Sequence, residues 1–246
     1  MKAVILAGGQ GKRLLPYTLD KPKCLLSVHG QTILDYQLAA LDFCKIKEVA
    51  IVTGFCHLAI IEHLQKKGIS VEIIHNHKYE ETNNAYGIWL ARDYVSKSPD
   101  GFLLINSDLI FRPAMLKFLI NHAEPDGIII QKKFDPKGDM VKIAMEGDNI
   151  VAMSKQVPPE QAVAEAIGPV KFSQKGGNNF LDFIGSFIAK GEFNHWFFYM
   201  LGDFARQHHF VGIENPGFVW AEIDTPEDLN LAKDIIPERF INIDVH

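Results

Sequence analysis

The sequence predicts an α/β protein built on a mostly parallel β-sheet. Short runs of apolar and β-branched residues alternate with segments of helical periodicity through the first half of the chain. This alternation is typical of parallel sheets whose strands are joined by right-handed helical crossovers. The chain has 246 residues, of which 47% are hydrophobic, so it is long enough to bury a full core without metal or disulfide support. We expect one domain with an inserted lobe.

Each expected strand is a short apolar run, and each expected helix has apolar residues at every third or fourth position. The expected strands span residues 2–7, 48–53, 71–74, 102–105, 127–130, 140–145, 150–153, 163–172 and 219–223. The expected helices span residues 33–41, 57–67, 84–95, 180–190, 195–207 and 226–236. The last helix has a clear start, because Thr225 suits its N-cap, Pro226 its first position, and Glu227 and Asp228 complement its dipole.

The pattern changes near Asp126. The turn residues 147–149 connect two expected strands into a β-hairpin, and Gly176-Gly177-Asn178-Asn179 is expected to break the chain before two adjoining helices. We interpret residues 126–210 as an inserted lobe or lid. It would lie between a binding half at 1–125 and a closing strand and helix at 211–246.

Composition excludes several classes of protein. The 25 Lys and Arg residues against 30 Asp and Glu residues give a net charge of −5, and no basic run is present, which argues against a nucleic-acid or anionic-membrane binder. Three cysteines without a CxxC pair argue against a disulfide framework or a structural zinc site. The first residues lack the features of a signal peptide, and no apolar stretch reaches the roughly 18 residues of a membrane span. We therefore expect a cytoplasmic protein.

A glycine-rich segment follows the first expected strand and reads Leu6-Ala7-Gly8-Gly9-Gln10-Gly11-Lys12-Arg13-Leu14. Glycines allow backbone N–H groups to face a phosphate chain without Cβ obstruction, and Arg13 and Lys23 add fixed positive charge. The segment is not a Walker A loop, because Arg13 stands where Ser or Thr must follow Gly-Lys. It is not a dinucleotide fingerprint either, because Leu14 stands at the third glycine position. A plain glycine turn with surface cations is the alternative interpretation.

Carboxylates follow two of the expected strands. Asp108 comes after the strand at 102–105, and Asp224 comes after the strand at 219–223. Open α/β sheets bind ligands at the carboxyl ends of their strands, and oxygen ligands there suit Mg²⁺ held against phosphate oxygens. Asp108 alone would more often be a turn or helix cap. Glu222 either supports Asp224 or is a solvated strand residue.

These segments together resemble a known family. Residues 8–14, with Pro16-Tyr17-Thr18 and Lys21-Pro22-Lys23-Cys24-Leu25-Leu26, resemble the signature of the nucleotidyltransferases that make NDP-sugars and CDP-alcohols. Five further stretches resemble the phosphocholine cytidylyltransferase-like branch and the inositol-1-phosphate cytidylyltransferases: residues 82–92, 106–108, 154–160, 165–168 and 220–229. The resemblance runs nearly end to end. It implies a Rossmann-like, GT-A-like fold whose inserted lobe binds the acceptor.

The resemblance also implies a role for each matching residue. Arg13 and Lys23 would be catalytic, and Asp108 and Asp224 would hold Mg²⁺. The nucleotide would be bound by Leu6, Ala7, Gly8, Gly9, Gln10, Gly11, Lys12, Arg13, Lys23, Thr82, Asn83, Asn84, Ser107 and Asp108. The acceptor would be bound by Lys155, Glu165, Gly168, Trp196 and Glu222.

The implied reaction is transfer of CMP from CTP to a small phosphorylated alcohol, amine or phosphonate, with release of pyrophosphate. The CDP-linked product would be an activated precursor for a cell-surface polysaccharide or lipid. One alternative is the same chemistry on a sugar 1-phosphate with UTP, dTTP or GTP, and another is a nucleotide-binding regulator without catalysis. A homodimer is a family-level expectation.

Aromatic residues offer one further hypothesis. A box that binds a quaternary ammonium through cation–π contacts could be formed by Tyr86, Trp89, Trp196, Phe197, Tyr199 and Trp220. Aromatic residues at helical spacing usually pack into the core. We therefore favour a packing role for Trp89 and Trp196.

Overall fold

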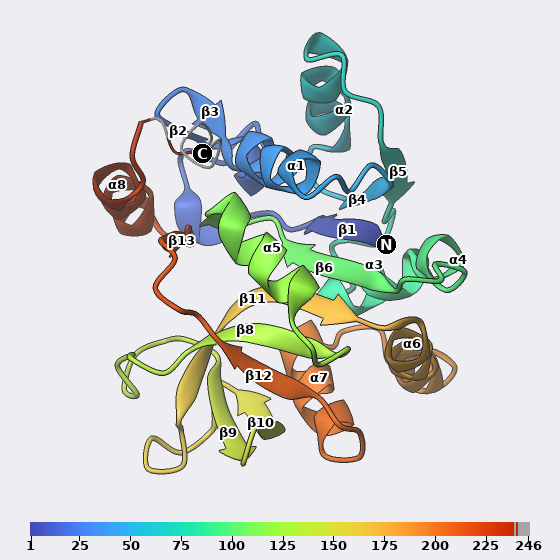
Figure 1. Cartoon of the computed structure of the whole chain (residues 1–246). Coiled ribbons are helices and arrows are strands. Elements are labelled where there is room, and N and C mark those ends of the chain that lie inside the picture. The colour runs from blue at the N-terminus through green and yellow to red at the C-terminus, as the bar shows by residue number, and fades with distance from the viewer. Residues whose placement is uncertain (239, 241–246) are drawn as a thin grey trace.

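A nine-stranded β-sheet runs through the part of the chain that the structure describes (Figure 1). The structure is a computed structural model, and it describes residues 1–238 and 240. Residue 239 and residues 241–246, the end of the closing segment expected at 211–246, lie outside the described residues. The strand order is β5-β4-β1-β6-β11-β8-β12-β10-β9, so the expected inserted lobe continues the sheet of the first half.

The first half of the sheet is parallel, as the sequence predicts. Its strands are β1 (Lys2–Ala7), β4 (Val49–Thr53), β5 (Glu72–His75) and β6 (Phe102–Asn106). β1 lies between β4 and β6 and pairs in parallel with both. Its residues are buried from Ala3 to Ala7, which is why this strand reads as a continuous apolar run.

The second half of the sheet is mixed, which corrects the expectation of a mostly parallel sheet within the confirmed α/β class. Its strands are β8 (Gly127–Gln131), β9 (Lys142–Glu146), β10 (Asn149–Ser154), β11 (Ala164–Phe172) and β12 (Val211–Glu214). β11 is antiparallel to both β6 and β8 and connects the two halves. β9 and β10 form the expected hairpin.

Helices cover both faces of the sheet. They are α1 (Ile33–Phe43), α2 (His57–Lys66), α3 (Asn84–Leu90), α4 (Arg92–Val95), α5 (Pro113–Asn121), α6 (Gln174–Ile188), α7 (Phe197–Ala205) and α8 (Pro226–Ile235). One apolar core lies between the sheet and α1, α2 and α5, and another lies between the sheet and α3, α6 and α7 (Figure 1). The sequence pattern did not predict α5, and it predicted a single helix where the structure has α3 and α4.

The expectation that glycines 176 and 177 break the chain is wrong. α6 begins at Gln174 and runs through both of them, because the Ser173 side chain caps it by accepting a hydrogen bond from the Gly176 N–H. Glycine is needed here for close packing. A Cβ on Gly177 would lie 2.3 Å from the buried Phe102 ring, and a Cβ on Gly176 would lie 2.2 Å from the Asp126 carboxylate.

A small third core joins the two ends of the chain. The strand β13 (Trp220–Glu222) pairs antiparallel with β7 (Leu109–Phe111), and α8 follows it. The N-terminus of α8 is the predicted one, with Thr225 and Asp228 forming a capping box. Core residues of this cluster include Leu14 and Leu26 from the start of the chain together with Ile223 and Leu229 from its end.

Four short elements complete the fold: the 3₁₀ turns η1 (Lys12–Leu14) and η2 (Lys23–Leu25) and the strands β2 (Ser27–Val28) and β3 (Gln31–Thr32). Within the described residues, no helix combines the length and apolarity needed to cross a membrane.

Candidate functional site

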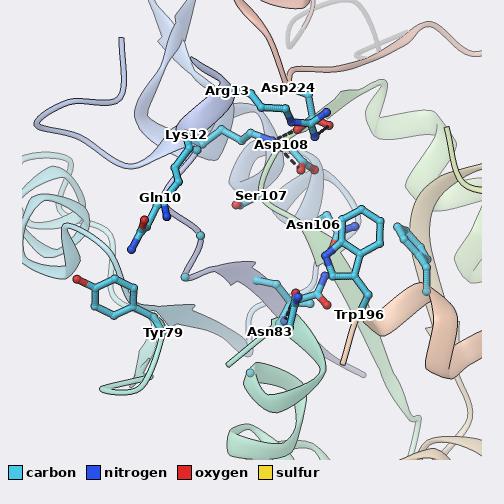
Figure 2. A pocket seen from close by; sticks show the side chains of 18 of the residues that line it. Gln10, Lys12, Arg13, Tyr79, Asn83, Asn106, Ser107, Asp108, Trp196 and Asp224 are labelled. Atoms are coloured by element: carbon cyan, nitrogen blue, oxygen red, sulfur yellow. Dashed lines mark hydrogen bonds and ion pairs between the residues drawn. The ribbon is translucent and has the colours of Figure 1, made fainter. Parts of the chain in front are cut away.

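A cleft of about 500 Å³ opens where the parallel strands end. It is bounded on one side by the glycine-rich loop and on the other by the second half of the chain (Figure 2). Seventeen of the residues predicted from the sequence line it: Leu6, Gly8, Gly9, Gln10, Gly11, Lys12, Arg13, Lys23, Thr82, Asn83, Asn84, Ser107, Asp108, Lys155, Trp196, Glu222 and Asp224.

The glycine-rich loop leaves β1 and turns into η1. Gly11 adopts a φ of +61°, which favours glycine, and its carbonyl accepts a 2.8 Å hydrogen bond from the Thr18 hydroxyl. A Cβ on Gly9 would meet no atom within 4 Å, so the cleft side of the loop is open. The loop can therefore present backbone N–H groups to an anion.

Lys23 lies at the centre of the charged cluster. Its ammonium donates to Asp108 Oδ2 at 3.0 Å and to Asp224 Oδ1, and Arg13 donates to Asp224 Oδ2 (Figure 2). Only 13% of the Lys23 side chain is exposed. Burial opposes its charge, but the carboxylates of Asp108 and Asp224 outweigh burial and raise the pKa of Lys23 to about 12. Lys23 is therefore a fixed positive charge at neutral pH.

Asp224 is correspondingly kept ionised. Burial would raise the pKa of its carboxyl group, but the positive charges of Lys23, Arg13 and Lys155 outweigh this effect and lower it. The backbone N–H of Asp224 donates to the capping carboxylate of Asp228 at 3.0 Å. The start of α8 therefore fixes the backbone that carries Asp224.

Backbone hydrogen bonds bring Asp108 and Asp224 together across 116 positions of the chain. Ser107 N–H donates to the Leu6 carbonyl at 3.3 Å, and Ile223 N–H donates to the Asp108 carbonyl at 3.0 Å. The first bond ties the turn after β6 to β1, and the second ties it to the end of β13. Both carboxylates therefore follow strand ends, as the sequence predicts.

Three carboxylates of this cluster fit a divalent metal ion. One oxygen from each of Asp108, Glu222 and Asp224 lies within 4.8 Å of the others. The second oxygen of Asp108 is buried and has no hydrogen-bond partner among the described residues, and such an atom is costly unless a ligand satisfies it. An all-oxygen donor set suits Mg²⁺ rather than a soft metal.

Glu222 lines the cleft and is partly exposed there, while protein around its carboxyl group limits its contact with water. Desolvation, followed by the negative charges of Asp108 and Asp224, raises the pKa of Glu222 to about 8. Glu222 therefore keeps its proton to a higher pH than an ordinary glutamate does.

The opposite wall of the cleft carries a second cationic group. Lys155 donates to Asp139 Oδ2 at 2.8 Å, and Arg13 Nη1 lies 3.6 Å from the same oxygen. Asp139 therefore bridges a cation from each wall. The Lys155 ammonium also lies 5.4 Å from the centroid of the Trp196 ring, which places an aromatic face beside this charge.

A polar group lies at the far end of the cleft from the carboxylates. Asn76 donates to the Thr82 hydroxyl at 2.9 Å, and Asn83 caps α3 by accepting from Asn84 N–H. Asn84 accepts from the Phe197 N–H at 2.7 Å and thereby attaches α3 to α7. Tyr79 and Trp196 lie on opposite sides of this end (Figure 2).

Three predicted residues do not line the cleft. Ala7 is buried in β1. Glu165 is on β11, where burial raises the pKa of its carboxyl to about 7. Gly168 has a φ of +125°, and a Cβ there would lie 2.7 Å from Leu109 Cδ1, so this glycine permits close packing.

The structure does not form the box of six aromatic residues that was considered for a quaternary ammonium. Of its six members, only Trp196 lines the cleft. Trp89 packs against the core and Gly185, and Phe197 is a core residue. The packing role that we favour for Trp89 is therefore confirmed.

Several residues that line the cleft were not predicted from the sequence: Asn76, Tyr79, Glu80, Asp139, Met140 and Phe198. The first three follow β5, so their place after a parallel strand was a usable signal. Asp139 lies in an irregular polar segment before β9, where no periodicity points to the cleft.

Comparisons with known proteins identify the family of this chain. The family model described as nucleotidyl transferase matches residues 2–138. A CTP:phosphoglutamine cytidylyltransferase of Campylobacter jejuni is 30% identical over 186 residues, which are 70% of this chain and 73% of that protein. A mannose-1-phosphate guanylyltransferase catalytic subunit beta of Drosophila pseudoobscura is 32% identical over 141 residues, 55% of this chain, and the match spans only 38% of that longer protein.

Solved structures establish the same fold. The inositol-1-phosphate CTP transferase from T. maritima superposes with a TM-score of 0.83 at 24% identity, covering 100% of this chain and 97% of that one. The CTP:phosphocholine cytidylyltransferase from Streptococcus pneumoniae has a TM-score of 0.78 at 21% identity and coverages of 96% and 99%. With a family model over more than half of its length and a relative matched over most of both chains, this chain belongs to the nucleotidyl transferase family.

Proposed function

We propose that this nucleotidyltransferase transfers CMP from CTP to a small phosphorylated alcohol, amine or phosphonate, and that it releases pyrophosphate and forms a CDP-linked product. The observation that carries the proposal is the cluster in which Lys23 lies between Asp108 and Asp224 beside the glycine-rich loop. The choice of CTP is supported by the cytidylyltransferase among the relatives.

The chemistry needs no dedicated general base. A phosphomonoester has a second pKa near ~6, so at neutral pH most of it is already a dianionic nucleophile. Its oxygen would attack the α-phosphorus of CTP in line with the leaving pyrophosphate. The protein then has to position two polyanions and neutralise their charges.

The first wall of the cleft carries the glycine-rich loop with Arg13, Lys23, Asp108 and Asp224. These residues would act on the triphosphate. The glycine-rich loop would bind phosphate oxygens through backbone N–H groups, and Arg13 and Lys23 would neutralise the charge that develops at the α-phosphate. Mg²⁺ held by Asp108 and Asp224 would supply further positive charge against the phosphate oxygens. Lys23 pairs with both carboxylates, and these bonds use two of the three N–H groups of its ammonium, so the third can donate to a phosphate oxygen.

The second wall of the cleft carries Asp139, Lys155 and Trp196. Two of these residues would bind the acceptor. Lys155 would pair with the acceptor phosphate, and Trp196 would contact the organic part beside it, because the two side chains are already adjacent. Glu222 belongs to the carboxylate cluster, and it also lies close enough to Lys155 for that charge to lower its pKa. Glu165 and Gly168 would act only from behind the cleft surface.

Transfer to a sugar 1-phosphate is the second candidate. It is favoured by the mannose-1-phosphate guanylyltransferase that is 32% identical to this chain over 141 residues. The two candidates share the triphosphate chemistry and differ in the base and the acceptor.

The deciding experiment measures pyrophosphate release with Mg²⁺ across a grid of substrates. CTP, UTP, dTTP, GTP and ATP are each combined with phosphocholine, 2-aminoethylphosphonate, inositol 1-phosphate, phosphorylated amino-acid amides and glucose 1-phosphate. We expect release with CTP and an acceptor that is not a sugar 1-phosphate.

Two outcomes would contradict the proposal. Release only with a sugar 1-phosphate would assign the second candidate. Nucleotide binding without pyrophosphate release on any acceptor would favour a nucleotide-binding regulator without catalysis. The Lys23→Ala variant is the control that separates enzyme turnover from background hydrolysis.

A further inference from the structure

Gln37, which no motif in the sequence singles out, makes two hydrogen bonds to the segment that carries Asp108. It lies on α1 and is 1% exposed. Its side-chain NH₂ group donates to the backbone carbonyls of Asn106 and Leu109, each at 2.8 Å. These two carbonyls lie on either side of Ser107 and Asp108, so a single amide group holds both ends of the turn.

Burial of Gln37 has an energetic cost that packing alone does not explain. Its Oε1 atom is buried and accepts no hydrogen bond from any described residue. A buried polar atom without a partner destabilises the fold, whereas an apolar side chain of the same shape avoids that cost. What glutamine adds over leucine at this position is the pair of donors.

Two backbone hydrogen bonds hold the middle residues of the turn, Ser107 and Asp108. Ser107 N–H donates to the Leu6 carbonyl, and the Asp108 carbonyl accepts from Ile223 N–H. Gln37 alone among the side chains of the described residues donates to the carbonyls that begin and end the turn. Together the three attachments fix the turn to β1, β13 and α1.

We propose that Gln37 is a positioning residue: by clamping both ends of the turn, it holds the Asp108 carboxylate in the geometry that binds the divalent cation and thereby sets cation affinity and rate. This inference rests on the proposed function, in which Asp108 is a metal ligand. Partners that orient a ligand in this way typically change metal affinity or activity by about 10–100-fold when removed.

Tyr36, the neighbouring residue on α1, offers a matched control. Its hydroxyl is buried and donates to the Val28 carbonyl at 3.0 Å, in a segment that does not contact Asp108. Tyr36→Phe therefore removes one buried hydrogen bond of the same helix without touching the turn. If Gln37 only attaches α1 to the sheet, the two variants should behave alike.

The test compares Gln37→Leu and Gln37→Asn with Tyr36→Phe in the full chain. The first readout is Mn²⁺ binding without nucleotide, followed by electron paramagnetic resonance. The second is amide hydrogen exchange of the peptide that spans residues 102–111 in the metal-free protein. The third is kcat and the half-saturating Mg²⁺ concentration for pyrophosphate release.

For Gln37→Leu we expect about 10–100-fold weaker Mn²⁺ binding, faster exchange in the 102–111 peptide and a matching loss in kcat. Gln37→Asn keeps the NH₂ group on a shorter side chain and should lie between Gln37→Leu and the parent. Tyr36→Phe should retain parental Mn²⁺ binding. If Gln37→Leu does not fold, Gln37→Met, an unbranched isostere without donors, replaces it.

Parental Mn²⁺ binding and exchange in Gln37→Leu would overturn the inference, and so would equal losses in Gln37→Leu and Tyr36→Phe. These two readouts do not depend on turnover. If the parent chain released no pyrophosphate on any substrate, the proposed function would fail while the exchange and Mn²⁺ measurements still decided the role of Gln37.

Discussion

The two walls of the cleft are built differently. On the first wall, Lys23, Asp108 and Asp224 are largely buried, and backbone hydrogen bonds from β1, β13 and α8 hold the turns that carry the carboxylates. On the second wall, Asp139 is 73% exposed and contacts the protein through its ion pairs with Lys155 and Arg13. Lys155 follows the end of β10, and 24% of its side chain is exposed, so the exposed charge of this wall is that of Asp139.

This difference separates two tasks. Charges held by buried backbone contacts cannot reorganise at low cost, and electrostatic catalysis benefits from such preorganisation. A charge on an exposed side chain, such as that of Asp139, exchanges partners easily. The first wall therefore suits a reaction step shared by a whole family, and the second suits an acceptor that differs between members.

The largest expected effect is on the first wall. Lys23→Ala removes the cation between Asp108 and Asp224, and Asp108→Ala removes a metal ligand. Each should lower kcat by about 10²–10³-fold while circular dichroism shows a folded chain. Lys47→Ala, which breaks an exposed Lys–Asp pair with Asp42 outside the cleft, is the control. Near-parental turnover in Lys23→Ala would refute the role given to that residue.

Lys155→Met tests the second wall and should give a different kinetic signature. The loss of a charge-assisted contact with the acceptor phosphate is expected to raise the acceptor KM by about 10–100-fold, with a much smaller change in the KM for CTP. Steady-state kinetics with each substrate varied in turn separates the two. An equal rise in both KM values would mean that Lys155 does not distinguish acceptor from nucleotide.

Asp139→Asn should improve acceptor binding. The Asp139 carboxylate pairs with Lys155 and Arg13, the cations assigned to substrate phosphates, so removing its charge removes a competitor. Because the Asp139 side chain is 73% exposed, we expect only about a two- to fivefold fall in acceptor KM. Asp135→Asn in the same segment is the matched control. A higher acceptor KM in Asp139→Asn would show that Asp139 assists binding instead.

The smallest effect concerns Glu165, behind the second wall. Burial raises its pKa from 4.5 to about 7, so between these pH values the folded chain retains a proton that the unfolded chain has lost. The contribution of Glu165 to the free energy of unfolding therefore falls as pH rises from about 4.5 to 7. Glu165→Gln removes this loss.

Thermal melts of parent and Glu165→Gln at pH 5 and pH 8 measure that contribution. The melting temperature of the variant, relative to that of the parent, should be higher at pH 8 than at pH 5. Partial exposure of the side chain keeps the difference modest. Equal differences at the two pH values would mean that Glu165 is not shifted by burial in solution.

Local sequence patterns predicted much of the first half of the fold and of the first wall. Strand β1 and the N-cap at Thr225 follow from apolar runs and capping chemistry, which depend only on neighbouring residues. Residues 8–13 and Asp108 were found because they follow strands directly.

Non-local contacts account for what the sequence did not predict. The position of β11 between β6 and β8 depends on burial across the whole sheet, so its antiparallel pairing has no local signal. The glycines of α6 were wrongly predicted to break the chain. They are needed because the Phe102 ring and the Asp126 carboxylate, about 75 and 50 positions earlier in the chain, leave no room for a Cβ. Asp139 and Gln37 likewise gain their roles from partners that are distant in the sequence.

The pairing of β13 with β7 has a consequence for biosynthesis. Translation delivers Lys23, beside the glycine-rich loop, 201 residues before Asp224. Until then the nascent polypeptide holds a lysine without one of its two carboxylate partners. The complete cluster of Lys23, Asp108 and Asp224 should thus form only when β13 docks on β7.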